Sequence, residues 1–442
     1  MSKRQETNSD SRKAHEDLRA AARRHLIRYG GDFLPPVIAE AKGAYMYDRE
    51  GRAILDFSSG QMCAILGHGH PAITRALESA TREVVHLFSN LLSPAVIELA
   101  EALAALLPPS LQKTMFLSTG GEANEAALRL AKLKTGGFEV LAFSSSWHGM
   151  TAGAASSTYA RGRRGYGPAM PGTLAIPAPN PYRCPVRHCR ERCDMTCLEA
   201  GMALADQQSV GAYAAFIAEP ILSSGGIVEL PQAYLERLQA LCEERGMLLI
   251  LDESQTALGR VGSNFAFEHS AAIPHILTLS KTLGAGLPLS ATVTSPEIEE
   301  ECYQKGFLHY TSHVSDPLPA RVGLAVLQVV AEERLADRAV EMGAYLKKGL
   351  RELMQRHQAL GDVRGRGLLL GIELVKDRES READPELTVR IARRALELGL
   401  SLSRVAAGKG SIFRIAPPLT ITREEIDSGL EILDQTLREC SD

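Results

Sequence analysis

The chain has 442 residues, of which 45% are hydrophobic and 23% charged, and its formal net charge is −4. This is the balance of an ordinary globular protein, and the slight negative charge gives no reason to expect nucleic acid or an anionic membrane as a partner. No segment approaches the roughly 20 consecutive apolar residues of a membrane span. Residues 1–16 are polar and lack the apolar centre of a signal peptide, so we expect a cytoplasmic protein.

The N-terminal part of the chain precedes the first strong sheet pattern. We expect residues 1–16 to form a disordered tail, and residues 17–70 to form a segment that packs with a smaller domain. A short amphipathic helix is expected around Asp17–Tyr29, and Gly43–Gly51 alternates and turns like a β-hairpin.

Short apolar runs alternate with helical patterns in the middle of the chain. The expected strands are Thr114–Ser118, Val140–Phe143, Thr173–Ile176, Ala214–Glu219, Met247–Asp252, Ile276–Ser280 and Ala291–Thr294. Amphipathic stretches between them include Glu122–Lys134 and Gln232–Arg245, and another ends near Gln207. This pattern predicts an α/β fold with a mostly parallel, seven-stranded sheet covered by helices on both faces. We assign residues 71–325 to this large domain.

The C-terminal third predicts a smaller α+β domain over residues 326–442. A long helical pattern covers about Pro319–Arg356, and a second covers Leu387–Leu398. Ile412–Ala416 has the pattern of a strand.

An ionisable residue lies at or directly after the end of two of the expected strands. Asp252 is the last residue of one strand, and Lys281 directly follows another. Open α/β sheets bind ligands at the carboxyl ends of their strands. An amine that can form an imine and an acid that can keep a ring nitrogen protonated are the two groups that a pyridoxal-phosphate enzyme needs. A single lysine after an apolar run is more often a surface residue.

Two further segments could serve the same cofactor. Ser118–Glu125 follows a strand and opens a helix, where Thr119, Gly120 and Gly121 could hold a phosphate; an ordinary helix cap is the alternative. Trp147, the only tryptophan, follows another strand and could stack on a ring or belong to the core.

Four of the eight cysteines cluster in a basic stretch, residues 182–200. They are Cys184, Cys189, Cys193 and Cys197, with His188 between them. They could bind zinc or an iron–sulfur cluster, or form disulfides. Their spacing is not that of paired C-x2-C knuckles, and a surface insertion with reduced thiols is the simpler interpretation.

Together these motifs resemble the class III aminotransferase family, from about Leu26 to the C-terminus. The segments that carry the resemblance are Gly120–Glu125, Trp147–Gly149, Glu219–Pro220, Asp252–Thr256 and Ser280–Lys281. The resemblance implies the fold type I architecture of pyridoxal-phosphate enzymes. Within the family, the chain is similar to the 2,2-dialkylglycine decarboxylases over Ser58–Met62, Gly67–Pro71, Ile217–Ile227, Leu279–Leu289, His313–Pro319 and Phe413–Thr420.

The resemblance implies a role for each residue of the site. Lys281 would bind the cofactor covalently and then move protons, Asp252 would hold the ring nitrogen protonated, and Trp147 would stack on the ring. Gln255 would donate a hydrogen bond to the phenolic oxygen of the ring. The other residues expected at the cofactor are Thr119, Gly120, Gly121, Asn124, Glu219 and, from a neighbouring subunit, Ser312. A homodimer or homotetramer is therefore expected.

Gln61 and Arg414 are expected to decide the reaction. Arg414 would hold a carboxylate in the plane of the ring, and Gln61 would hold the group perpendicular to it, where a bond breaks most readily. We expect a decarboxylase that is also a transaminase, a lyase converting a 2,2-dialkylglycine such as 2-aminoisobutyrate, with pyruvate, to a ketone, CO2 and alanine. The alternative is a class III aminotransferase without decarboxylation, acting on an amine, an ω-amino acid or an α-amino acid. A non-catalytic binding protein organised by the cysteines is a further alternative.

The same resemblance implies binding of potassium or sodium. The expected ligands offer oxygen atoms and are Leu87, Ser89, Ser312, Val314 and Asp316. The chain departs from the decarboxylases at Leu107, where a second metal site needs a threonine, at Ser312 in place of threonine and at Ala257 in place of glycine. The cysteine-rich stretch is absent from their pattern.

Overall fold

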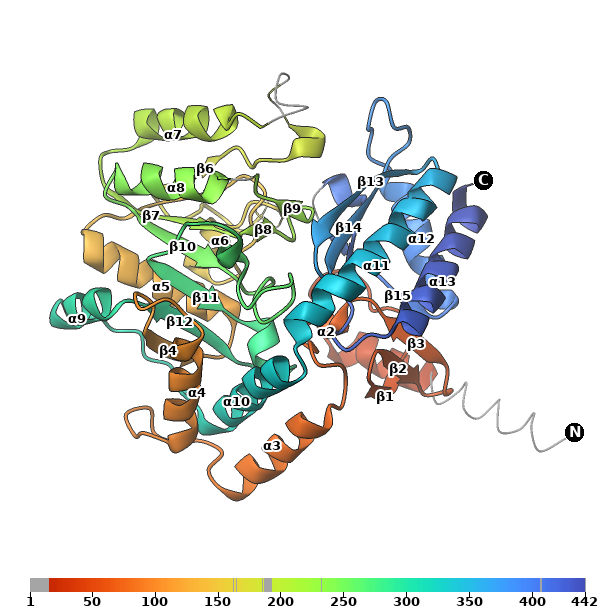
Figure 1. Ribbon diagram of the computed structural model, residues 1–442, viewed down its shortest axis with the longest axis horizontal. Coiled ribbons are helices and arrows are strands. Elements are labelled where there is room, and N and C mark those ends of the chain that lie inside the picture. The colour runs from red at the N-terminus through yellow and green to blue at the C-terminus, as the bar shows by residue number, and fades with distance from the viewer. Residues whose placement is uncertain are drawn as a thin grey trace, which may run out of the picture.

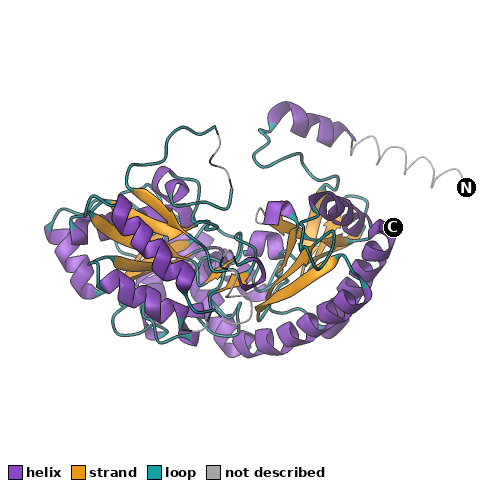
Figure 2. Cartoon of the chain, turned by 90° about the horizontal axis from the view of Figure 1, so that it is seen from above, coloured by secondary structure: helices purple, strands orange, loops and turns teal. Residues whose placement is uncertain are grey.

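The computed structural model describes residues 16–441 except 162, 164, 185, 187–192, 232, 406 and 407. Figures 1 and 2 show two packed halves, each with β-sheet inside and helices outside. Residues 16–25 form a helix that lies apart from both sheets (Figure 2). No helix in the described part of the chain is both long and apolar enough to cross a membrane.

A seven-stranded sheet forms the centre of the larger half. Its order is β4-β12-β11-β10-β7-β5-β6. The strands are β4 (Lys113–Leu117), β5 (Glu139–Phe143), β6 (Thr173–Ile176), β7 (Tyr213–Ala218), β10 (Leu248–Asp252), β11 (Ile276–Leu279) and β12 (Ser290–Thr294). Only β12 runs against its neighbours within this sheet. The expected seven-stranded, mostly parallel sheet is therefore confirmed.

Alternate residues of the strands fill two different cores. On one face, Val140 and Ala142 of β5 join a cluster with Ala127 and Leu130. On the other face, Leu141 and Phe143 belong to the main core. Because both faces are buried, the strands need apolar residues at every position. Each large side chain buried in this way contributes about 1.5–3 kcal/mol of hydrophobic stabilisation.

The helices of this half cover both faces of the sheet (Figure 1). They are α3 (Pro71–Arg82), α4 (Pro94–Ala105), α5 (Gly120–Thr135), α6 (Ala152–Ser156), α7 (Thr196–Gln208), α8 (Tyr234–Glu243), α9 (Pro296–Gln304) and α10 (Pro317–Glu332). Shorter 3-10 turns are η1 (Pro181–Arg183), η3 (Ala266–His269) and η4 (Lys281–Gly284), and β8 (Ile221–Leu222) pairs with β9 (Val228–Glu229).

The smaller half joins the two ends of the chain. One sheet has the order β13-β14-β17-β16 and the other β1-β2-β3-β15. The first contains β13 (Leu360–Arg366), β14 (Leu369–Leu374), β16 (Ser403–Val405) and β17 (Ile412–Ile415). The second contains β1 (Ile38–Lys42), β2 (Tyr45–Asp48), β3 (Ala53–Asp56) and β15 (Leu400–Ser401). Its helices and turns are α2 (Ser59–Met62), α11 (Leu335–Arg356), α12 (Pro385–Glu397), α13 (Arg423–Ser441) and η5 (Gly408–Gly410). Since β15 pairs with β3, a strand from the C-terminal part of the chain completes the sheet of the three N-terminal strands.

The expectation that one long helical pattern covers about Pro319–Arg356 is wrong. The structure has two helices, α10 and α11, separated at Arg334, whose φ is +50°. α10 packs on α3 and α4 in the larger half, whereas α11 packs on β13 in the smaller half. The chain bends because its two parts pack against different cores. No glycine or proline marks the break, so no local stop signal indicates it in the sequence.

Candidate active site

Asp252 and Lys281 come from neighbouring strands at one edge of the large sheet. β10 and β11 are parallel, with Asp252 opposite Thr278. Lys281 follows three positions later and begins η4 with a φ of +42°. Such a backbone conformation costs a non-glycine residue of order 1–3 kcal/mol and is typical of functional sites. The two predicted residues therefore meet at the carboxyl ends of their strands.

The Asp252 carboxylate is buried and accepts three hydrogen bonds. Its Oδ2 accepts from His148 Nδ1 at 2.9 Å and from Asn124 Nδ2 at 2.8 Å, and its Oδ1 accepts from the Ser254 N–H at 3.1 Å. Asn124 Oδ1 in turn accepts from the Thr278 hydroxyl at 2.7 Å. Burial acts to raise the pKa of Asp252, but hydrogen bonds from His148 and Ser254, together with the charges of His148 and Lys281, outweigh it, so the pKa lies below its usual value. An ionised carboxylate can hold a protonated ring nitrogen.

The Lys281 amine is in a low-dielectric environment. Burial lowers its pKa, the Asp252 charge opposes this shift, and the Arg414 charge adds to it. A lysine whose pKa is lowered has more of the neutral amine that attacks an aldehyde.

The start of α5 combines a helix cap with a close backbone approach. The Thr119 hydroxyl accepts from the Glu122 N–H at 3.4 Å, and the Glu122 carboxylate accepts from the Thr119 N–H at 3.0 Å, so the ordinary cap is present. Gly120 and Gly121 follow, where first-turn N–H groups lack a carbonyl partner. A Cβ on Gly120 would lie 3.1 Å from Ser254 Oγ. Glycine leaves room here for an anion to approach the amides.

Trp147 lies after β5, with its ring half-exposed. The backbone N–H of Trp147 donates to Glu219 Oε1 at 2.9 Å, and the backbone N–H of Ser223 donates to Glu219 Oε2 at 3.2 Å. Burial raises the pKa of Glu219 to about 7. Glu219 therefore holds the backbone that carries the predicted stacking residue.

These groups fit pyridoxal phosphate. A buried ionised acid, a buried amine, an aromatic ring and free amides at a helix start are the partners that its ring nitrogen, aldehyde, ring face and phosphate require. Asp252, Lys281, Trp147, Gly120 and Gly121 would hold it.

Arg414 reaches the site from β17 of the smaller half. Its guanidinium is buried and donates to Gln255 Oε1 at 2.7 Å, Ser403 Oγ at 3.3 Å and Ser223 Oγ at 3.5 Å. Burial lowers the pKa of Arg414 to about 10. Within the described part of the chain, it forms no ion pair with a carboxylate.

Gln61 lies in a kinked segment that leads into the site. Its φ is +67°, and its side chain is exposed. Cys63 follows two residues later. Burial raises the pKa of Cys63, while the charges of Lys281 and Arg414 lower it, which places this thiol near both.

Ser312 is exposed in the segment between α9 and α10. No hydrogen bond joins it to the start of α5 within the described chain, and its role at the cofactor of a neighbouring subunit stays a prediction.

Asp316, a predicted alkali-metal ligand, binds two imidazoles. Its Oδ1 lies 2.5 Å from His86 Nδ1 and its Oδ2 lies 2.6 Å from His313 Nδ1. The Ser89 hydroxyl donates to the Thr311 carbonyl at 3.3 Å. Both carboxylate oxygens are thus engaged, and the alkali-metal site, which also includes Leu87, Ser312 and Val314, stays a prediction.

Three residues near the site had no role assigned from the sequence. His148 follows Trp147 directly, and a polar residue after a buried strand is a signal that could have identified it. Ser223 and Cys63 carry no such signal, because only folding brings them to Arg414 and Lys281.

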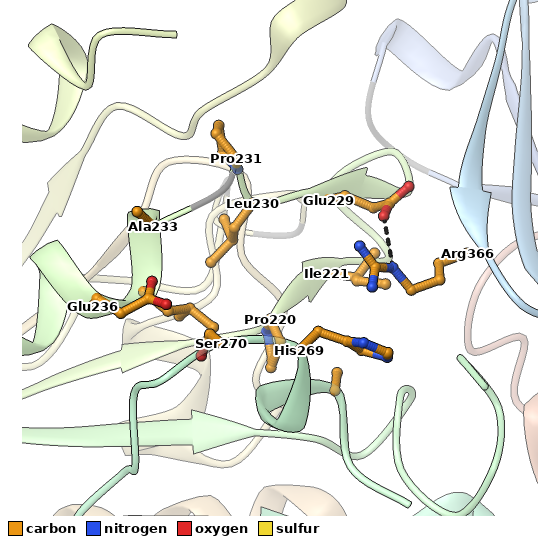
Figure 3. Close-up of a pocket in the computed structure, with 12 residues that line it drawn as sticks. Pro220, Ile221, Glu229, Leu230, Pro231, Ala233, Glu236, His269, Ser270 and Arg366 are labelled. Carbon is orange, nitrogen blue, oxygen red and sulfur yellow. Dashed lines mark hydrogen bonds and ion pairs between the residues drawn. The ribbon is translucent and has the colours of Figure 1, made fainter. Parts of the chain in front are cut away.

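A pocket of about 350 Å³ is lined in part by Pro220, the residue that follows Glu219 in the chain. Glu229 and Arg366 form an ion pair of 3.1 Å within it (Figure 3). None of the predicted site residues lines this pocket, so it is separate from the candidate active site.

Comparisons with known proteins agree on one family. A family model described as aminotransferase class-III matches residues 28–437. An uncharacterised aminotransferase of Schizosaccharomyces pombe is 53% identical and covers 94% of this chain and 93% of its own. A leucine/methionine racemase of Thermococcus litoralis is 36% identical, covering 92% and 91%.

Solved structures agree with this result. A Bacillus anthracis aminotransferase has a TM-score of 0.91 and 30% identity, covering 97% of this chain and 99% of its own. An amine transaminase from an uncultivated Pseudomonas species, solved with pyridoxal phosphate bound, has a TM-score of 0.86 and 28% identity, covering 94% and 99%. The fold type I architecture is confirmed. These relatives are aminotransferases and a racemase, so the expected closeness to the 2,2-dialkylglycine decarboxylases is not shown.

Proposed function

The chain belongs to the class III aminotransferase family, whose enzymes depend on pyridoxal phosphate, and we propose that it moves the amino group of an α-amino acid to a 2-oxo acid without releasing CO2. Transamination without decarboxylation is the alternative that the sequence left open, with an amine or an ω-amino acid as other possible donors. The aminotransferases among its relatives support it.

The environment of Arg414 is the observation that favours a substrate with a carboxylate. A buried guanidinium costs free energy unless an anion pairs with it. The hydrogen-bond partners of Arg414 in the described chain are the neutral oxygens of Gln255, Ser223 and Ser403. Its charge also lowers the pKa of Lys281, so the guanidinium and the amine are near each other. A substrate carboxylate next to the reacting amine would complete this arrangement.

Each residue of the site has a separate role in the proposed amino-group transfer. When bound, pyridoxal phosphate supplies an aldehyde for the substrate amine and a ring that withdraws electrons from the breaking bond. Asp252, held ionised by His148, keeps a proton on the ring nitrogen. Lys281 Nζ takes the proton from the substrate Cα, and burial, which lowers its pKa, suits it to this role. Arg414 fixes the carboxylate and so selects which bond of Cα faces the lysine.

Decarboxylation remains a second candidate because of Gln61. A glutamine with a φ of +67° is strained, and strain of this kind persists where function requires it. A neutral amide that steers a second carboxylate toward the ring perpendicular would favour loss of CO2. The predicted donor is then 2-aminoisobutyrate, with pyruvate as acceptor.

A shared site in a homodimer or homotetramer is part of the proposal. The segment around Ser312 and the segment before α4 lie together, because Ser89 bonds Thr311. Both expose large apolar side chains, which a second copy would cover. These are Val85, Phe88, Leu91, Leu92, Leu308 and Tyr310.

One experiment separates the two reactions. The loaded enzyme is incubated with pyruvate and either an L-amino acid or 2-aminoisobutyrate, while new alanine and released CO2 are measured together. Alanine from the L-amino acid without CO2 is the expected result. CO2 and acetone from 2-aminoisobutyrate would show instead that Gln61 directs decarboxylation. Failure of both donors, with cofactor bound, would contradict the proposal.

A further inference from the structure

Two histidines and an aspartate meet where the segments that precede α4 and α10 lie together. His86 Nδ1 lies 2.5 Å from one carboxylate oxygen of Asp316, and His313 Nδ1 lies 2.6 Å from the other. The centres of the two imidazole rings are 5.2 Å apart. One ligand atom from each of the three residues lies within 4.8 Å of the other two. The fold thus gathers around one point side chains that are up to 230 positions apart in the chain.

The Asp316 carboxylate bonds the imidazoles and does not cap its own helix. Asp316 is the N-cap residue of α10, but its side chain makes no capping hydrogen bond, although such a bond contributes about 1 kcal/mol. Its ion-pair partners within the described chain are the two histidines, whose imidazoles carry no permanent charge. Arg321, further along α10, pairs with Glu83 and Glu98 instead. A cation at this point would supply the charge that the carboxylate lacks.

Packed structure holds the segment that carries two of these side chains. The Ser315 N–H donates to the Phe116 carbonyl of β4 at 3.0 Å. Val314 packs against an apolar cluster that contains Leu117 of the same strand and two alanines of α5. The segment is therefore fixed on the large sheet before any ion binds, which lowers the entropy cost of binding.

We propose that His86, His313 and Asp316 bind a zinc ion. Imidazole nitrogens suit zinc and other divalent transition metals, whereas hard cations prefer oxygen ligands. Three protein ligands with one open position are a common arrangement for zinc. On binding, each Nδ1 loses its proton to water and Nε2 takes one up, so the imidazoles stay neutral and no oxidation state changes.

The site needs only a small adjustment to take the ion. A tetrahedral zinc ion with bonds of about 2.0–2.1 Å keeps its ligand atoms about 3.3 Å apart, so each nitrogen–oxygen distance would lengthen by less than about 1 Å. The side chains of His86 and His313 are 49% and 65% exposed, so both rings are free to make this movement. Asp316, at 11%, is the fixed member of the group.

This ion differs from the potassium or sodium that the sequence led us to expect. Both sites would use Asp316, but the alkali-metal site surrounds it with oxygen atoms, whereas the structure surrounds it with nitrogen atoms. Zinc bound to these nitrogens would occupy the carboxylate that an alkali ion needs. The two sites therefore exclude each other.

The cysteine-rich stretch, residues 182–200, shows no comparable group of ligand atoms among its described residues. Cys184, Cys193 and Cys197 are free thiols there, and Cys197 is buried in the main core. His188 and Cys189 lie outside the described residues. Metal binding by the cysteines therefore stays a prediction from the sequence.

Zinc titration of the full-length, cofactor-loaded protein tests the site without reference to activity. The protein is treated with chelator, transferred to buffer with potassium chloride and titrated with Zn²⁺ alone by calorimetry. About one zinc per chain is expected. His86→Ala and His313→Ala should each weaken binding by more than about 10-fold, since even the outer partners of metal ligands contribute that much. With Cu²⁺ in place of zinc, electron paramagnetic resonance should show coupling to two nitrogen nuclei.

His25→Ala is the matched control, since His25 is also exposed but lies in the helix of residues 16–25. It should keep the zinc affinity. Circular dichroism and the absorbance of the bound cofactor verify that the variants are folded, and Asp316→Asn, which keeps the shape of the side chain, should also weaken binding. The proposal is overturned if the folded wild-type chain binds no zinc in potassium chloride. It is also overturned if the folded His86 and His313 variants bind zinc as tightly as the wild type, as they would an adventitious ion only.

Discussion

His148 Nδ1 and Asp252 Oδ2 lie 2.9 Å apart in a pair that is buried at the carboxyl end of β10. Because a carboxylate only accepts hydrogen bonds, the proton is on Nδ1 and the imidazole donates. This donor keeps the pKa of Asp252 low although burial would raise it. His148 therefore keeps Asp252 ionised, ready to hold a protonated nitrogen of the cofactor ring.

Replacing His148 by leucine should weaken cofactor binding about 10- to 100-fold, because a hydrogen bond to a charged group contributes about 1.5–3 kcal/mol. His148→Gln, which keeps a donor, should recover part of the loss. His275→Leu is the control, since His275 Nδ1 also bonds β10, accepting from the Leu249 N–H at 3.0 Å, but at the opposite end of the strand. The cofactor dissociation constant is measured by absorbance titration. Equal losses in His148→Leu and His275→Leu would indicate a general packing defect.

Arg414→Gln should raise KM for an α-amino acid by about 100-fold, since truncating one member of a buried charge pair costs about 2–5 kcal/mol. An amine donor without a carboxylate should show a much smaller change. Arg404→Gln on the neighbouring strand β16 removes an exposed arginine and should leave both donors unchanged. Steady-state kinetics with the two donors measures this difference. An equal loss for both donors would mean that Arg414 does not bind the carboxylate.

Some residues of the candidate active site could be predicted from the sequence, and others could not. Asp252 and Lys281 were predictable because their strands are short, apolar and sharply ended, so strand ends locate the residues. Gln255 was expected to form a hydrogen bond with the phenolic oxygen of the cofactor ring. In the structure, its Oε1 accepts a hydrogen bond from Arg414 at 2.7 Å. Such a contact joins residues 159 positions apart and depends on how the smaller half packs against the larger.

The break between α10 and α11 was missed for the same reason. Helical periodicity reports which face of a segment is apolar, but it does not report which core that face meets. At Arg334 the chain passes from one core to the other, and tertiary packing overrides a continuous local pattern. The ion pair between Glu373 and Arg183 likewise could not be predicted from the sequence, because it joins the cysteine-rich stretch to a strand 190 residues away.

Glu219 should make the cofactor-free chain less stable as pH rises from about 4.5 to 7. Burial raises its pKa from 4.5 to about 7, so in this interval the folded state binds more protons than the unfolded state. Stability is then present at low pH and is lost as the pH rises through the folded pKa, by up to roughly 3 kcal/mol. Glu219→Gln should reduce this loss, and the exposed Glu300→Gln should not. Urea unfolding at pH 5 and pH 8 measures it; an unchanged pH dependence in Glu219→Gln would contradict it.

Glu373→Gln should lower both stability and the binding of carboxylate substrates. Glu373 is fully buried and pairs with Arg183 at 2.5 Å and with Arg364 at 2.7 Å. Removing one charge from such a group costs about 3–5 kcal/mol, because the partner cations are left uncompensated. β14 also pairs with β17, where Gly371 lies opposite Arg414. A loosened β14 should therefore misplace the guanidinium.

The expected result is a lower free energy of unfolding in urea together with a raised KM for an α-amino acid, while KM for an amine without a carboxylate changes little. Glu382→Gln is the matched control. Glu382 also forms an ion pair, with Lys376 at 2.6 Å, but it is exposed, and exposed pairs contribute less than about 1 kcal/mol. If Glu373→Gln changed stability without changing the KM difference between the two donors, its role would be confined to holding the halves together. The position of Arg414 would then depend on β17 itself and on its hydrogen bond to Gln255.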